Sequence, residues 1–525
     1  MINCREGAAP GNQFDSPGKT GNISSDPNPS HSTDPILGNP PLNSKFPLPS
    51  TAFIHPQGEN LEAIDRLVHR VVEMVLHTAA DAGNRSPLPG AQPLPQRDDL
   101  PDSSVDEETL LADLQRFLHQ SMNAAHPGYI GHMDPIASTM SIMGGLATAS
   151  LNNNMLSLEL SPVFSRLEVR LMARLARLFG LGDQSGGLLL SGGSLANLQA
   201  MAVARNTRFN VMESGLTGLL KKPVMFTSDV AHTSFLKAAM LLGLGTDAVI
   251  GVETNANSRM IPAALEEAIL QAGAAGWHPF LVAATAGTTV TGSIDPLEEI
   301  GKVARNHGLW YHVDAAYGGA LMMSDQAKHR LAGVELADSV TFNPQKWMYV
   351  TKVCATLMFK DMNVLEKGFR VQLPYMQNPE GFINFGEISV QGTRHPDVLK
   401  LWLTLQHLGR QGLGGLVDGC LELTTGFLER VKARPHLVLS GDPETNIVVF
   451  RGAPPWIDED QWDDWNAMLQ AALLEKGNTF LAISRYRGRK WLRAVLVNPY
   501  TTQETLDNLF THLDGFFALS QEERR

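Results

Sequence analysis

The chain lacks the features that mark several classes of protein. Its three cysteines, Cys4, Cys354 and Cys420, have no pair spacing, which excludes a disulfide framework and a cysteine-type zinc site and fits the reducing cytoplasm. No apolar run reaches the ~18 residues of a membrane span, and no basic run is interleaved with aromatic residues. With a net charge of −12 over 525 residues, we expect no metal, no membrane association and no nucleic-acid partner.

The N-terminal part has few apolar residues until position 59. Residues 1–55 are rich in Pro, Ser, Asn and Gly, which predicts a disordered tail, and a Pro-rich stretch at 86–102 predicts a linker. Between them, apolar residues recur with helical spacing from Leu61 to Val75. A helix outside the main body packs either on a partner subunit, giving a homodimer, or on its own domain. Residues 56–123 are therefore predicted to be an N-terminal helical segment.

Residues 124–395 alternate between short apolar strands and amphipathic helices. This alternation predicts an α/β fold with a large, doubly wound, mostly parallel sheet, in which ligands bind at the carboxyl ends of the strands. One helix is expected to start with Ser161 as N-cap and Pro162 at its first position. Residues 396–525 begin with a long helix and continue with strands and further helices, which predicts a smaller α+β C-terminal domain.

Two small-residue segments follow predicted strands. "SGGSLAN" (191–197) opens a helix, and its free N–H groups could bind a phosphate, although a plain strand-to-helix turn reads the same way. It lacks the lysine of a P-loop, which disfavours ATP and GTP. "ATAGTTVTGSIDP" (284–296) is either a hydroxyl-rich binding loop or a glycine turn in which Asp295 caps the helix starting at Pro296.

Asp314 in "HVDAAYGGA" and Lys346 in "TFNPQKW" are ionisable groups in apolar surroundings. Such a pair forms either a structural ion pair or a reactive site, because a desolvated lysine amine attacks carbonyls. With the phosphate cradle and His232, each at a strand's carboxyl end, the combination indicates pyridoxal 5'-phosphate. That cofactor needs a phosphate anchor, a stacking group, a carboxylate at its ring nitrogen and a lysine.

The sequence resembles the group II pyridoxal-phosphate decarboxylases, a family acting on glutamate, cysteine sulfinate, aspartate, aromatic amino acids or diaminobutyrate. The resemblance rests on "HPGYIGH", "SPVFSRLE", "SGGSLAN", "SDVAHTS", "TAGTTVTGSIDP", "HVDAAYGG", "ADSVTFNPQKW" and "QGTRHPDVLKLW". It implies a fold-type-I enzyme that releases carbon dioxide and an amine from an L-amino acid through a Lys346 Schiff base, with catalytic residues Lys346, Asp314, His232 and Tyr375. The implied cofactor-binding residues are Gly193, Ser194, His232, Thr289, Asp314, Ala316, Asn343, Gln345 and Lys346.

Substrate choice is less constrained by the sequence. Arg394 resembles a substrate-carboxylate anchor, and His132, Asn152 and Asn154 are polar candidates for the same pocket, which favours a small acidic substrate. Aromatic or diamino substrates, another fold-type-I enzyme such as an aminotransferase or a lyase, and a non-catalytic homologue remain alternatives. Gln345 stands where the family usually has histidine, so the phosphate would receive an uncharged amide donor.

Overall fold

The computed structural model describes residues 48–90, 93–94, 99–376 and 381–522, so most of the predicted disordered tail lies outside it. Contacts divide the described residues into two units, one made of residues 48–66 and 101–104 and the other of the remainder. The site and both sheets belong to the second unit. Among the described residues, no helix is long and apolar enough to cross a membrane.

The larger sheet has seven strands in the order β1-β7-β6-β5-β4-β2-β3. Only β7 runs antiparallel to its neighbours, which confirms the predicted mostly parallel α/β sheet. Its strands are β1 (Gly186–Leu190), β2 (Pro223–Ser228), β3 (Val249–Val252), β4 (His278–Thr285), β5 (Trp310–Asp314), β6 (Ser339–Phe342) and β7 (Ala355–Phe359). All seven coincide with apolar runs of the sequence.

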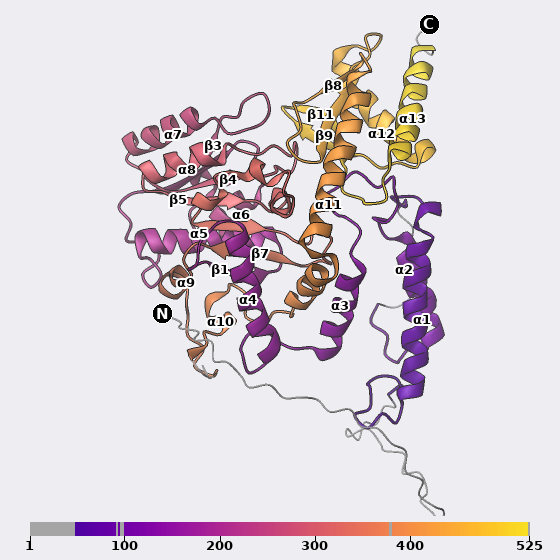
Figure 1. Cartoon of the computed structure of the whole chain (residues 1–525), viewed down its shortest axis with the longest axis horizontal. Coiled ribbons are helices and arrows are strands. Elements are labelled where there is room, and N and C mark those ends of the chain that lie inside the picture. Colours follow the sequence, from indigo (N-terminus) through magenta and orange to yellow (C-terminus); the bar gives the residue numbers. More distant parts are fainter. Residues whose placement is uncertain (1–47, 91–92, 95–98, 377–380, 523–525) are drawn as a thin grey trace, which may run out of the picture. The chain divides into compact units, whose positions relative to one another are not determined.

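Helices cover both faces of this sheet, as Figure 1 shows. In β2, Val224 and Phe226 join the core beneath α7 and α8, whereas Met225 joins the core beneath α5 and α6. This alternation is expected of a strand that is buried on both faces. The helices before β7 are α1 (Leu61–Ala80), α2 (Glu107–Gln120), α3 (Thr139–Leu151), α4 (Pro162–Leu178), α5 (Gly193–Phe209), α6 (Ser234–Leu241), α7 (Pro262–Ala274) and α8 (Leu297–Asn306).

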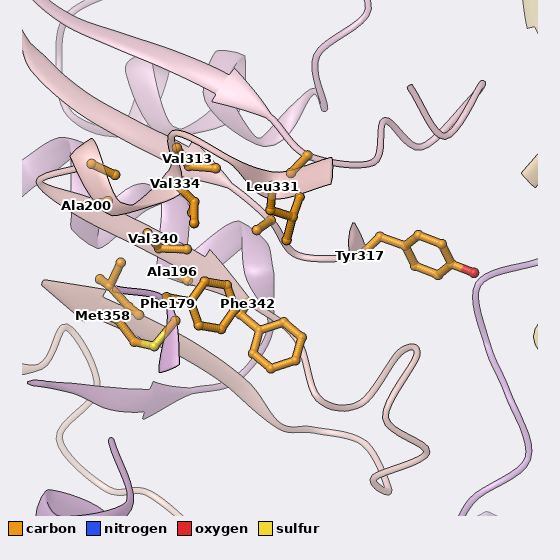
Figure 2. Close-up of a cluster of buried hydrophobic side chains, with 14 of the residues drawn as sticks. Phe179, Ala196, Ala200, Val313, Tyr317, Leu331, Val334, Val340, Phe342 and Met358 are labelled. Carbon is orange, nitrogen blue, oxygen red and sulfur yellow. The ribbon is translucent and has the colours of Figure 1, made fainter. Parts of the chain in front are cut away.

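Side chains from the central strands of the large sheet form an apolar core. Figure 2 shows Val313 of β5, Val340 of β6 and Met358 of β7 in one buried cluster with Phe179 and Phe342. The rings of Phe179 and Phe342 lie 5.5 Å apart. Rigid packing of this kind fixes where each strand ends, and therefore where the side chains at the strand ends are placed.

A second sheet of four antiparallel strands, ordered β10-β11-β9-β8, follows the long helix α11 (Figure 1). The remaining elements are α9 (Asn363–Gly368), α10 (Phe385–Ile388), α11 (Val398–Lys432), β8 (Leu437–Leu439), β9 (Ile447–Gly452), α12 (Trp462–Gly477), β10 (Ala482–Tyr486), β11 (Arg489–Val495) and α13 (Gln503–Glu522). Helix α11 changes direction at Gly409, whose φ of 64° favours glycine. The predicted smaller α+β region is therefore present.

The prediction that α4 starts with Ser161 as N-cap and Pro162 at its first position is confirmed, whereas the predicted cap of α8 by Asp295 is wrong. Ser161 occupies the N-cap position of α4, but its hydroxyl donates to Met155 Sδ at 3.1 Å and caps no backbone N–H. Asp295 does not cap α8. Its carboxylate is buried and accepts hydrogen bonds from the N–H groups of Met260 (2.7 Å) and Thr285 (2.7 Å). It therefore joins the segment around Met260 to the end of β4.

Candidate active site

A cavity of about 270 Å³ lies where several strands of the large sheet end. Strands β1, β4, β5 and β6 all have their carboxyl ends here, the edge at which sheets of this kind bind ligands. Every residue that the sequence analysis assigned to the cofactor lines it. The lining residues are Ser191, Gly192, Gly193, Ser194, Asn197, His232, Thr285, Gly287, Thr289, Asp314, Ala316, Asn343, Gln345 and Lys346.

The turn from β1 into α5 forms one wall of the cavity. Gly192 has a φ of 105°, a conformation that L side chains rarely adopt. A Cβ at Gly193 would approach Asn343 Nδ2 to 2.8 Å, so only glycine leaves this wall open. The first N–H groups of α5 have no partner within their own helix and face an anion favourably. This wall fits a phosphate group.

Asp314 is the last residue of β5 and is buried, with an exposed fraction of 4%. Its Oδ2 accepts a hydrogen bond from Asn197 Nδ2 (2.8 Å), and its Oδ1 accepts one from the Ala316 N–H (3.1 Å). Among the described residues, no ion pair joins this carboxylate to Lys346 within 4.0 Å. The two groups line one cavity without contacting each other, so they do not form the structural ion pair that the sequence left open.

Lys346 follows β6 in the turn that begins with Asn343. Its N–H donates to the Asn343 carbonyl at 2.9 Å, which fixes the backbone from which the amine reaches the cavity. Burial lowers the pKa of the Lys346 amine, while the negative charge of Asp314 acts in the opposite direction. A lowered pKa raises the fraction of free amine, the form that attacks a carbonyl carbon.

His232 lines the cavity from the loop that precedes α6. Its Nδ1 accepts a hydrogen bond from the Ser234 N–H at 3.1 Å, so the ring proton is on Nε2. Burial lowers the pKa of His232, which favours the neutral imidazole. A neutral, flat ring held in one orientation is suited to stacking against an aromatic ligand.

Three polar side chains of the cavity have unused hydrogen-bonding capacity. Gln345 Oε1 accepts a hydrogen bond from the Cys354 N–H at 2.5 Å, which leaves its Nε2 as a donor for a ligand. Thr285 Oγ1 and Asn343 Oδ1 are buried and have no partner within the described chain. Buried polar atoms without partners are rare, and here they border a cavity that a polar ligand would occupy.

This donor set fits pyridoxal phosphate. The turn at Ser191–Ser194 with Gln345 would hold its phosphate, His232 and Ala316 would border its ring, and Asp314 would receive its ring nitrogen. Lys346 would hold its aldehyde carbon. When bound, the cofactor supplies an electron sink for bonds that break at the α-carbon of an amino acid.

The other predicted site residues lie outside the cavity lining. Tyr375 is 68% exposed in the loop after α9. Asn152 is exposed and ends α3 in the left-handed conformation, with a φ of 48°. Asn154 Oδ1 accepts hydrogen bonds from the N–H groups of Leu156 (3.0 Å) and Arg394 (3.3 Å). Their assigned roles stay predictions.

Arg394 lies in a buried ion pair away from the cavity. Its Nη2 is 3.0 Å from Glu168 Oε1, its Nη1 donates to the Leu189 carbonyl at 2.7 Å, and both side chains are buried. The guanidinium also lies 4.8 Å from the centre of the Phe385 ring. In this structure Arg394 pairs with Glu168 and does not line the cavity, so its assigned role as substrate anchor stays a prediction.

Arg493 of β11 is not a lining residue but contacts the cavity wall through Thr289, and the sequence analysis missed it. It is 6% exposed, and its Nη1 donates to the carbonyl of Thr289, a lining residue, at 2.7 Å. Its Nη2 donates to the Gly131 carbonyl (3.2 Å) and to His132 Nδ1 (2.9 Å). His132 is thus neutral and lies beside the site. The sequence signal that could have identified Arg493 is its position as a lone arginine within the apolar segment "WLRAVLVNP".

Comparisons with known proteins agree with this chemistry. The family model described as the pyridoxal-dependent decarboxylase conserved domain matches residues 90–453. A curated mouse protein, "Acidic amino acid decarboxylase GADL1", is 33% identical over 432 residues, which are 79% of this chain and 78% of the relative. Its human counterpart is 32% identical over 431 residues, 79% of this chain and 82% of the relative.

Solved structures show the same fold. The crystal structure of mouse CSAD in apo form has a TM-score of 0.81 and 31% identity, covering 86% of this chain and 98% of that one. The structure of Oryza sativa TDC with pyridoxal phosphate and tryptamine has a TM-score of 0.83 at 23% identity, covering 89% and 100%. The chain therefore belongs to the pyridoxal-dependent decarboxylase family and is a pyridoxal phosphate-dependent amino-acid decarboxylase, a carboxy-lyase.

Proposed function

We propose that this decarboxylase acts on a small acidic L-amino acid, namely aspartate, glutamate or cysteine sulfinate, and releases carbon dioxide and the amine. The observation that carries the proposal is the buried guanidinium of Arg493, which contacts Thr289 of the cavity lining. The mouse and human relatives are acidic amino acid decarboxylases, which supports the same substrate class.

Arg493 is a buried cation whose hydrogen bonds all go to neutral acceptors. They are the carbonyls of Thr289 and Gly131 and the Nδ1 of His132, and no carboxylate within the described chain forms an ion pair with it. Burying a charge without a counter-ion is costly, whereas a planar guanidinium binds carboxylates strongly. The distal acid group of a substrate in the cavity would supply the missing counter-ion.

Each of the main cavity residues would have its own role in the reaction. The Lys346 amine would hold the cofactor at its aldehyde carbon. Asp314 would hold a proton at the ring nitrogen through its carboxylate, and His232 would border the face of the ring. For the proton returned to the α-carbon, we propose Tyr375 first and His232 or Lys346 otherwise.

We propose further that the enzyme is a cytoplasmic homodimer. Helix α3 exposes Ile142, Met143, Leu146 and Leu151, which are 39–56% accessible, and a second copy of the chain would cover them. The two cysteines in the described part of the chain are both free, as a reducing compartment requires. Light scattering coupled to size-exclusion chromatography would test the dimer, and a monomer at micromolar concentration would contradict it.

The substrate proposal is tested by comparing acids with their amides. Purified holoenzyme is offered aspartate and asparagine, glutamate and glutamine, cysteine sulfinate, and the aromatic and diamino L-amino acids, and carbon dioxide release is measured for each. We expect kcat/KM to be highest for one of the three acids and at least about tenfold lower for an amide of the same size, the loss of roughly one charged hydrogen bond. Preference for an aromatic or diamino acid would overturn the proposal.

A further inference from the structure

A series of hydrogen bonds runs from Trp310 to Asp314 through three buried side chains. Trp310 Nε1 lies 2.9 Å from Ser339 Oγ, which lies 2.8 Å from His312 Nδ1. His312 Nε2 lies 3.2 Å from Asn197 Oδ1, and Asn197 Nδ2 lies 2.8 Å from Asp314 Oδ2. Ser339 and His312 are completely buried, and Asn197 is 1% exposed. We call these five residues the Asp314 relay.

The direction of every hydrogen bond in the Asp314 relay is fixed by its two ends. The indole N–H of Trp310 can only donate, and Asp314 Oδ2 accepts from Asn197 Nδ2. Asn197 must therefore turn its NH₂ group to Asp314, which leaves its carbonyl oxygen to accept from His312 Nε2–H. The neutral ring of His312 then accepts at Nδ1 from the Ser339 hydroxyl, and that hydroxyl accepts from Trp310.

The surroundings of His312 keep its ring neutral. Burial lowers its pKa to about 4, and Asp314 is the charged group that acts against this shift. The edge of the Phe235 ring faces the imidazole, with the two centres 6.1 Å apart. A neutral imidazole has one donor and one acceptor, as the relay requires.

The fold brings the relay together from three elements. Trp310, His312 and Asp314 alternate along β5 and so project from one face of the sheet. Ser339 opens β6 directly opposite His312 in the parallel register, and Asn197 comes from the first turns of α5. The relay thus connects the strand that carries Asp314 to the helix whose start forms the phosphate wall.

We propose that Asn197, His312 and Ser339 are positioning residues that keep the Asp314 carboxylate directed at the ring nitrogen of pyridoxal phosphate. Hydrogen bonds in series polarise one another, so each donor strengthens the next bond towards the carboxylate. Asn197 Nδ2 at one oxygen and the Ala316 N–H at the other also prevent the carboxylate from rotating. The effect reaches the cofactor only through its ring nitrogen.

Because the relay acts through the ring nitrogen of the cofactor, it can be tested without measuring activity. Apoenzyme is titrated with pyridoxal phosphate and with its 1-deaza analogue, in which a carbon replaces the ring nitrogen, and the two dissociation constants are compared. The Asp314 relay stabilises only the ligand with the nitrogen. A change that merely loosens the fold weakens both ligands alike, so the ratio of the constants isolates the relay.

The variants are Asn197→Ala, which removes the bond to the carboxylate, and Ser339→Ala, which removes a donor two bonds away. The matched control is Thr341→Val on the same strand, because Thr341 is completely buried and its hydroxyl has no partner within the described chain. We expect the preference for pyridoxal phosphate to fall at least about tenfold in Asn197→Ala and about threefold in Ser339→Ala, and to be unchanged in Thr341→Val.

Two results would overturn the proposal. A ratio that stays at the wild-type value in Asn197→Ala and Ser339→Ala would show that these side chains only support the fold. A ratio that falls in Asn197→Ala alone would reduce the relay to a single contact with Asp314. A variant that binds both ligands more weakly by the same factor keeps the wild-type ratio, which is the first result. A partly destabilised variant therefore still distinguishes the outcomes.

Discussion

Replacing Arg493 with glutamine tests the substrate site most selectively. Glutamine keeps an amide donor for the neighbouring carbonyls of Thr289 and Gly131 but removes the positive charge. If Arg493 binds the distal acid group of the substrate, the variant loses its preference for acids over amides. If Arg493 only supports the wall of the cavity, acids and amides are affected alike.

The size of the effect follows from the burial of the guanidinium. At 6% exposure, the charge is poorly screened by water, and removing one partner of such a pair costs roughly 2–4 kcal/mol. That range corresponds to a loss of about 30- to 1,000-fold in kcat/KM for the acidic substrate. For the matching amide, which makes no ion pair, we expect a change of less than about fivefold.

The assay measures carbon dioxide release from aspartate and asparagine, or from glutamate and glutamine, with wild type and Arg493→Gln. The ratio of the two kcat/KM values is unaffected by the fraction of active enzyme, so partial unfolding of the variant does not confuse the result. Arg493→Lys, which keeps the charge, should retain part of the preference. An unchanged ratio in Arg493→Gln would refute the assignment of the distal acid group to this residue.

Three further predictions follow from the described contacts. Glu168→Ala should lower the free energy of unfolding by about 3–5 kcal/mol, because it leaves the Arg394 charge buried alone, and a double variant with Arg394→Ala should cost less than the sum of the single variants in urea denaturation. Asp314→Ala should lower kcat by more than the ~10²–10⁴ typical of losing one acid–base group, and activity within tenfold of wild type would exclude its role. Burial raises the pKa of Asp295 to about 6, above the ~3.9 of an unfolded chain, so its stabilising contribution is present below pH 4 and lost as the pH rises through 6. Urea denaturation should show wild type losing up to about 3 kcal/mol more than Asp295→Asn over that interval, and parallel pH profiles would contradict this.

The sequence was most informative where chemistry and periodicity coincide. Strands of the large sheet are apolar runs that end in Asp314, Thr285 or the turn at Ser191, so their carboxyl ends could be located from the sequence alone. The antiparallel course of β7 left no local signal, because a strand buried on both faces is equally apolar in either direction.

The cofactor-binding residues could be predicted from the sequence, and the substrate-binding residues less well. Residues that hold the cofactor sit in short motifs with small neighbours, which sequence patterns reveal. Arg394 and Arg493 differ only in their partners: Glu168, 226 positions earlier, neutralises the first, and no carboxylate in the described chain pairs with the second. Pairing between such distant residues depends on the tertiary fold, which periodicity cannot show.

The central claim is that Lys346 holds the cofactor in the cavity that Asp314 lines. Reducing the holoenzyme with borohydride fixes the cofactor to the amine that carries it, and peptide mass spectrometry then identifies that lysine. We expect the pyridoxyl group on Lys346, and we expect the Lys346→Ala variant to lose both this group and the visible absorbance. A pyridoxyl group on any other lysine, or visible absorbance that persists in Lys346→Ala, would contradict this claim.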